Sequence, residues 1–169
     1  MKTYVLFVAA LSVSAPALAQ QPTDAQIASI VVTANQVDLD AGKLAEARGA
    51  SAEVKAFGKQ MATDHARVNA SAVELVTKLK VTPEDNPTSQ ALKAGGDRNL
   101  ATLKSLSGAA FDKAYIANEV AYHQQVLDAV DKVLIPSATN EELKALLVKV
   151  RPAFVSHLEH AKRLQAALK

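Results

Sequence analysis

Histidines are the side chains of this sequence best suited to chemistry, and three of the four share a pattern. His65, His123 and His157 each fall within the apolar stripe of their own segment, whereas His160 lies one step off its stripe. A neutral imidazole is the commonest metal ligand among protein side chains. We therefore expect the first three rings to meet in a water-poor interior and to bind a metal ion, with His160 beside them.

Carboxylates that could complete such a site lie at matching positions. Glu119 precedes His123 by one helical turn on the same face, and Asp38 lies one step off the stripe of the first segment. Adjacent helical residues point about 100° apart, so we expect Asp64 to point away from His65, toward a helix boundary or solvent. Histidines and carboxylates from different helices could hold Zn, Fe, Mn or Cu. The predicted metal site comprises Asp38, His65, Glu119, His123 and His157 as ligands. His160 is expected to contact these ligands from outside, without binding the ion itself.

A histidine core can also be purely structural, and this alternative stays open. Each ring would then be neutral and hydrogen-bonded to Glu119, Asp38 or Tyr122, and would set how the helices align. The protein would be a metal-free bundle with a structural or protein-interaction role. In the absence of metal, burial should lower the pKa of these histidines below about 6.5.

The residues favour a binding protein over an enzyme. Di-iron carboxylate bundles carry two Glu-x-x-His pairs, but residues 62–65 read Ala-Thr-Asp-His and residues 157–160 read His-Leu-Glu-His. An oxidase is therefore the least favoured hypothesis. The chain has no Cys, which excludes thiolate metal sites and a cysteine nucleophile. It also lacks the Gly-x-Ser-x-Gly sequence of a serine nucleophile elbow.

Long amphipathic helices must position these groups. Apolar residues recur every three or four positions over four segments, and no segment alternates with period two as a strand would. Capping residues and prolines mark the ends of these segments. The predicted helices run from the Thr23 cap to about Arg48, from the Ser51 cap to about Leu79, from about Gly108 to Ile135-Pro136, and from a capping box at Thr139 to Leu168.

The segment between the second and third long helices has a weaker pattern. Residues 88–107 look helical but are interrupted by Gly95-Gly96, so we expect one or two short helices there. The predicted fold is all-α, a ferritin-like four-helix bundle with a long crossover connection. That topology makes the second and third long helices parallel. His65 and His123 then lie at one level, since each is roughly 21 to 22 Å from the start of its helix.

The N-terminus resembles a cleavable signal peptide. A single Lys2 precedes an apolar stretch over residues 4–13, and Ala17-Leu18-Ala19 fits a cleavage site. About ten apolar residues are too few for a membrane span, which needs about twenty. We expect residues 1–19 to be removed and residues 20–169 to form one domain. The mature protein should be exported, periplasmic or secreted, with no membrane span.

The composition argues against one class of partner and does not identify another. A formal charge of +2 over 169 residues is too close to neutral for an obvious nucleic-acid binder. Alanines along the first helix permit close helix approach either within the chain or between chains. A second copy of the chain and an envelope protein are therefore both open as partners.

Three motifs of the chain resemble the domain of unknown function 4142 family. They are Ser51-x-x-Val54-Lys55-x-Phe57-x-x-x-Met61-x-x-Asp64-His65, then Phe111-Asp112-x-x-Tyr115-Ile116 leading to His123, and His157-x-x-x-Ala161-x-x-Leu164. The resemblance covers about residues 27–168. It implies a small exported bacterial protein of the ferritin-like group, and it implies no established activity. Carried over by position, the motif residues are Asp64, His65, Phe111, Asp112, Tyr115, His123 and His157.

Overall fold

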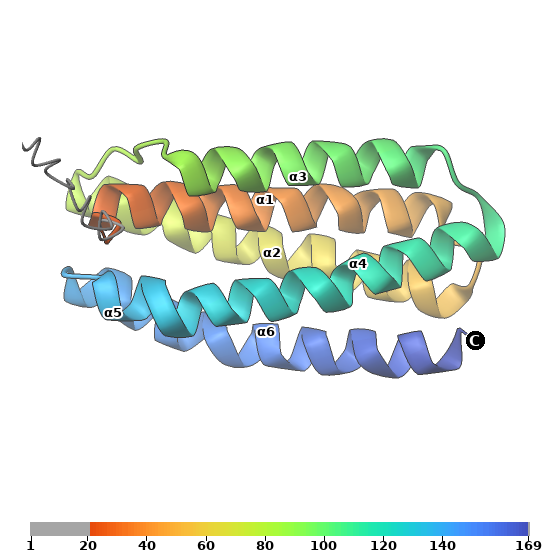
Figure 1. Cartoon of the computed structure of the whole chain (residues 1–169). Coiled ribbons are helices and arrows are strands. Elements are labelled where there is room, and N and C mark those ends of the chain that lie inside the picture. The colour runs from red at the N-terminus through yellow and green to blue at the C-terminus, as the bar shows by residue number, and fades with distance from the viewer. Residues whose placement is uncertain (1–20, 169) are drawn as a thin grey trace, which may run out of the picture.

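The structure, a computed structural model, describes residues 21–168, and most of them are helical (Figure 1). No strand occurs in this range, which confirms the all-α prediction. The predicted signal peptide at residues 1–19 lies outside it. The elements are α1 (Asp24–Arg48), α2 (Ala52–Leu79), α3 (Pro87–Lys104), α4 (Gly108–Ala129), the π-helical turn η1 (Val130–Leu134), α5 (Ile135–Ser137) and α6 (Glu141–Ala167).

Local capping signals set most helix ends where the sequence predicts them. Thr23 and Gln26 form the expected capping box at the start of α1, with reciprocal bonds of 3.3 and 3.2 Å. Ser51 caps α2. The prediction at α6 is wrong by one residue, because Asn140 and not Thr139 is the N-cap. The Asn140 side-chain oxygen accepts two backbone N–H groups at 3.0 Å, which leaves no role there for a Thr139 capping box.

The third long helix continues slightly past its predicted end. Its backbone widens into the π-turn η1, where the Ile135 N–H donates to the carbonyl of Val130. Pro136 has no N–H to donate, and it occupies the first turn of α5, where that group is not needed. The helical path therefore reaches Ser137 instead of stopping at Ile135-Pro136.

The crossover is one continuous helix, α3, of 18 residues. It passes through Gly95-Gly96 without the predicted interruption. A Cβ atom at Gly96 would lie only 2.7 Å from a methyl carbon of Val37 on α1. Glycine here serves close packing of α3 against α1 and does not break the helix.

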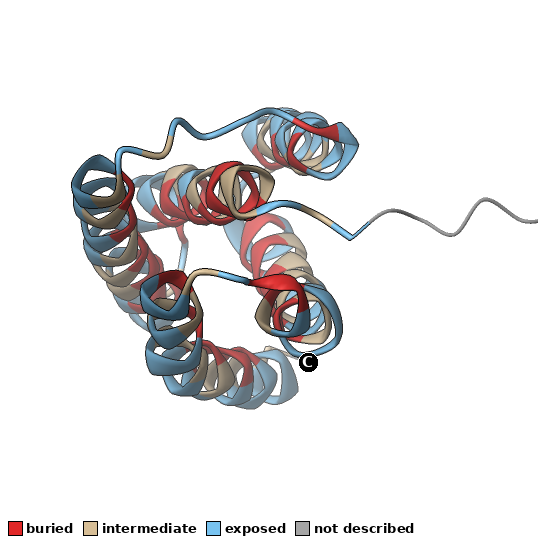
Figure 2. Ribbon diagram, turned by 90° about the vertical axis from the view of Figure 1, so that its left-hand side faces the viewer, coloured by how far each residue is buried: buried red, intermediate tan, exposed pale blue. Residues whose placement is uncertain are grey.

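Helices α1, α2, α4 and α6 form the bundle, and α3 packs outside it along α1 and α4 (Figures 1 and 2). Helices α2 and α4 run in the same direction, as the predicted topology requires. Helices α1 and α2 make the most extensive contact in the bundle. A Cβ atom at Gly42 would lie 2.7 Å from the backbone oxygen of Gly58. A larger residue than glycine therefore does not fit at Gly42 or Gly58, where α1 and α2 meet.

The bundle interior has two large apolar layers, one toward each end, and a smaller apolar cluster of Leu127, Phe154 and Leu158. One layer contains Phe57, Met61, Phe111, Tyr115 and Ile116. The other contains Ile27, Ile30, Leu134, Leu143 and Leu147. Along each of the four helices, the predicted metal-binding residues fall between the two layers.

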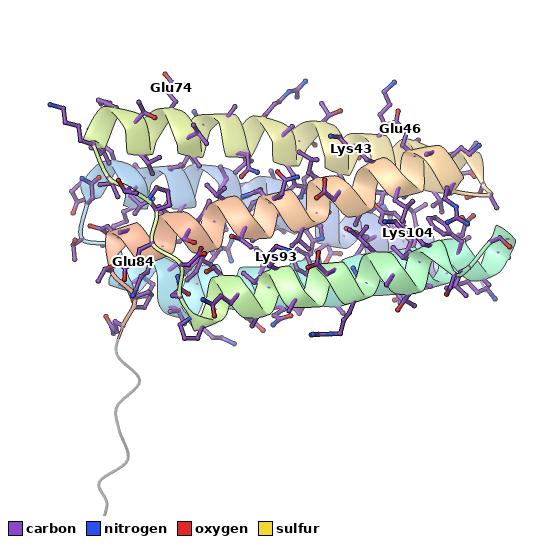
Figure 3. The ribbon with its side chains drawn as sticks, turned by 90° about the horizontal axis from the view of Figure 1, so that it is seen from above. Lys43, Glu46, Glu74, Glu84, Lys93 and Lys104 are labelled. Carbon is purple, nitrogen blue, oxygen red and sulfur yellow. The ribbon has the colours of Figure 1, made fainter. Side chains whose placement is uncertain are left out.

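Charged side chains otherwise lie mainly on the outside. The side chains of Lys43, Glu46, Glu74, Lys93 and Lys104 are exposed, and Figure 3 shows them projecting from α1, α2 and α3. Within residues 21–168, no helix is both long enough and apolar enough to cross a bilayer.

Candidate metal centre

All four helices of the bundle contribute to one buried polar cluster. Asp38 comes from α1, His65 from α2, Glu119 and His123 from α4, and His157 from α6. Each of the five residues is at most 4% exposed. The ring centroids of the three histidines lie 5.3 to 5.6 Å from one another. The structure therefore brings together the five ligands that the sequence predicts.

The donor atoms of this cluster are close enough to share an ion. Asp38 Oδ2 lies 3.1 Å from His65 Nε2 and 3.4 Å from His123 Nε2. One ligand atom from each histidine, and likewise one from each of Asp38, Glu119 and His123, lie within 4.8 Å of one another. Ligands held at about 2 Å from one ion lie roughly 3 to 4.5 Å apart. The two sets of three share His123, whose Nε2 faces Asp38 and whose Nδ1 lies 3.5 Å from Glu119 Oε2.

The tautomer of His65 is set by a neighbour on α1. Its Nδ1 lies 2.7 Å from Asn35 Oδ1. The Asn35 amide nitrogen donates to the backbone oxygen of Val31 at 2.8 Å, which fixes the amide oxygen toward the histidine. An amide oxygen only accepts, so the proton of the neutral ring is on Nδ1. The Nε2 lone pair of His65 therefore faces Asp38.

The rings of His123 and His157 also direct one N–H to an outer oxygen and leave the other nitrogen unprotonated. His123 Nδ1 lies 3.1 Å from the backbone oxygen of Glu119, so its N–H points there and its Nε2 is left as the acceptor. His157 Nε2 lies 3.1 Å from the carboxylate of Asp64, which leaves Nδ1 without a proton. Metal-binding histidines characteristically donate their other N–H to an outer oxygen in this way. All three rings are thus held in the form that can bind a metal.

The atoms facing the middle of the cluster lack hydrogen-bond partners. Most buried polar atoms in proteins are hydrogen-bonded, and each unsatisfied one costs about 1 to 3 kcal/mol. The 3.1 Å contact between Asp38 Oδ2 and His65 Nε2 places two lone pairs face to face unless a proton or a cation lies between them. The unpartnered buried atoms of the cluster are both Asp38 oxygens, Glu119 Oε2, His65 Nε2, His123 Nε2 and His157 Nδ1.

Burial shifts the pKa values of the cluster toward neutral side chains. It raises the pKa of Asp38 from 3.8 to about 7, although the neighbouring carboxyl group of Glu119 opposes the rise. Burial also raises the pKa of Glu119 well above its usual value, and the negative charge of Asp38 adds to this effect. It lowers the pKa of His65 well below 6.5 and that of His123 to about 4. The prediction of depressed histidine pKa values is confirmed, and a nearby cation would favour the ionised carboxylates.

His160 does not join the cluster. Its half-buried ring contacts Phe57 edge-on, with the centroids 5.0 Å apart, and its Nδ1 lies 3.3 Å from Gln60 Oε1. The outer positions expected of it are taken by Asn35 and Asp64. Asp64 points away from His65 as predicted, but it reaches across to α6 and binds His157. No spacing in the sequence predicts the contact of Asn35 with His65 or of Asp64 with His157, because both contacts depend on how neighbouring helices are rotated.

The comparisons with known proteins identify the family without adding an activity. The family's sequence profile, described as Domain of unknown function (DUF4142), matches residues 9–164. The chain belongs to the DUF4142 family. No curated protein and no solved structure matches it. The resemblance drawn from the motifs is confirmed.

Part of the DUF4142 motif around Phe111 has a structural explanation. Asp112 is buried, and its two carboxylate oxygens accept the backbone N–H groups of Ala50 and Ser51 at 2.8 Å. These bonds hold the turn between α1 and α2 against the start of α4. Phe111 and Tyr115 fill the neighbouring apolar layer. His65, His123, His157 and Asp64 are the motif residues that contribute to the polar cluster.

Proposed function

We propose that this protein is an exported helical bundle that binds a transition metal ion, in a role of storage, buffering or stress protection. One observation supports the proposal most: the buried atoms without partners are the lone pairs that a metal ion would take up. Asp38, His65, Glu119, His123 and His157 would hold the ion. The ion would supply the positive charge that this cluster of carboxyl groups and neutral imidazoles lacks.

The mixture of donors indicates which ions suit the cluster. Imidazole nitrogen favours Zn, Cu and Fe, while carboxylate oxygen also suits Mn. Ca²⁺ and Mg²⁺ prefer sites built from oxygen ligands. Three imidazoles with two carboxyl groups therefore favour a transition metal over either of these ions.

Export is the second part of the proposal and is supported by the residues at the N-terminus. Lys2, the apolar stretch that follows it and the Ala17-Leu18-Ala19 site have the order of a signal peptide. A mature chain would begin at Gln20. Its intact mass can be measured on the same preparation as the metal content.

The test is metal analysis of untagged protein purified from its native compartment. We expect about one equivalent of a transition metal and a lower Tm after EDTA treatment. A ligand at 100 times its Kd stabilises the folded state by about 2.7 kcal/mol. His123→Leu should abolish metal binding, whereas the matched variant His160→Leu should keep it, since His160 lies outside the cluster. Substoichiometric metal with no EDTA effect would overturn the proposal.

A metal-free structural bundle is the second candidate, and the shifted carboxyl groups favour it. With a pKa of about 7, Asp38 can be protonated near neutral pH, and a protonated carboxyl could donate to His65 Nε2 across 3.1 Å. The cluster would then be a neutral polar layer that aligns the helices. This candidate predicts that His65→Leu leaves function intact and changes stability little, whereas the metal proposal predicts loss of metal binding.

A further inference from the structure

A cavity of about 460 Å³ extends from the polar cluster between α1, α3 and α4. Asp38, His65 and His123 line its inner end. Glu119 and His157 do not line it. An ion bound in the cluster would be approachable from this cavity.

The walls of the cavity are mostly apolar, and its rim is polar. Arg98 and Asn99 of α3 lie at the rim, with Arg98 exposed. Apart from Asp38 and the histidines, Arg98 is the one lining residue that is charged at neutral pH, because burial raises the pKa of the Tyr122 hydroxyl well above 10. Its positive charge favours the entry of anions. The apolar wall includes Ile30, Val31, Leu92, Val126, Leu147 and Phe154.

We propose that this cavity binds a small monocarboxylic acid with an apolar chain. Its carboxylate would bind the metal ion at the inner end, and its chain would lie along the apolar wall. The volume falls in the range of about 300 to 1,000 Å³ that is usual for small-molecule sites. The proposal rests on the proposed metal-binding function, because the ion supplies the charge that attracts the carboxylate.

The experiment uses purified mature protein loaded with Co²⁺, whose visible absorption depends on its ligands. Metal content is measured first, and the protein is then titrated with octanoate and with acetate. Both acids offer the same carboxylate, and only octanoate has a chain for the apolar wall. We expect octanoate to change the spectrum and to bind at least about tenfold more tightly, since burial of two CH₂ groups already gives that ratio.

A matched pair of variants on α3 locates the binding. Ala91 lines the cavity, whereas Ala101 does not, and both residues are exposed. Ala91→Phe should place a ring in the cavity and remove the tenfold preference for octanoate. Ala101→Phe should keep it. Both variants should bind Co²⁺ fully, because neither substitution touches a ligand.

The outcomes separate this proposal from the metal-binding function. Failure of the protein to take up Co²⁺ would overturn both. Full Co²⁺ loading with octanoate no stronger than acetate would overturn the cavity proposal alone. Equal octanoate binding by Ala91→Phe and Ala101→Phe would overturn it too, because the acid would then bind elsewhere.

Discussion

The two apolar layers and the polar layer between them share the same four helices but differ in how their groups are satisfied. In the layer around Phe57 and Met61, side chains pack against other apolar groups and are fully buried. In the polar layer, Asp38, Glu119 and His123 are buried to the same degree, yet each has an atom without a hydrogen-bond partner. Equal burial thus stabilises the fold in one region and costs free energy in the other.

The difference between the apolar layers and the polar layer bears on the role of each. Apolar side chains at the cluster positions would remove the desolvation cost of buried carboxyl groups, and such replacements are often neutral or stabilising. The polar groups are also held in place by outer partners, Asn35 for His65 and Asp64 for His157. On the metal-binding proposal, this orientation would serve binding, and the apolar layers would supply the stability of the bundle.

The largest effect is expected from Phe57→Ala in an apolar layer. The substitution leaves a cavity in a fully buried site and should lower the free energy of unfolding by about 3 to 5 kcal/mol. Denaturant unfolding measures this loss, with and without metal. Metal content should stay that of the wild type. A variant that kept its stability but lost its metal would break the proposed division between the layers.

A smaller effect is expected from Asp64→Ala, which removes the outer partner of His157. Loss of such a partner typically weakens metal binding 10- to 100-fold, about 1.4 to 2.7 kcal/mol. Competition with a chromophoric chelator measures the affinity. Asp40→Ala is the matched control, because Asp40 accepts a hydrogen bond from Gln36 away from the cluster. Equal affinities of the two variants would show that His157 needs no outer carboxylate.

The smallest effect is the pH dependence of the metal-free protein. Between pH 8.5 and 7, folded Asp38 takes up protons because its pKa is about 7, whereas the unfolded chain, with a pKa near 3.8, does not. The contribution of Asp38 to the free energy of unfolding should therefore rise by about 0.4 kcal/mol as the pH falls through this window. The buried histidines oppose this gain within the same window, because about a quarter of each unfolded imidazole is already protonated at pH 7.

Unfolding in EDTA at both pH values tests this prediction, and Asp38→Asn should lose much of the rise. The metal-loaded protein should show the opposite slope, because the ligands must be deprotonated to bind the ion. The same pH dependence of the wild type and Asp38→Asn in EDTA, or the same slope with and without metal, would contradict the assignment of Asp38 as a buried acid in contact with the site.

Local patterns in the sequence were enough to predict the long helices and which of their faces are buried. Helix periodicity and end caps are local properties, so Thr23, Ser51 and the apolar stripes were enough to predict α1, α2, α4 and α6 closely. The same periodicity placed His65, His123 and His157 on interior faces. A rise of 1.5 Å per residue then brought His65 and His123 to one level, as the structure confirms.

Contacts between side chains of different helices could be identified only from the structure. Asp64 of α2 meets His157 of α6, whereas His160, one turn further along α6, contacts Phe57 and Gln60 of α2. Gly96 likewise suggested a helix break in the sequence, whereas in the structure it allows Val37 of α1 to pack against α3. These contacts depend on the rotation and separation of packed helices, which the summed packing of many side chains sets and which no short stretch of sequence encodes.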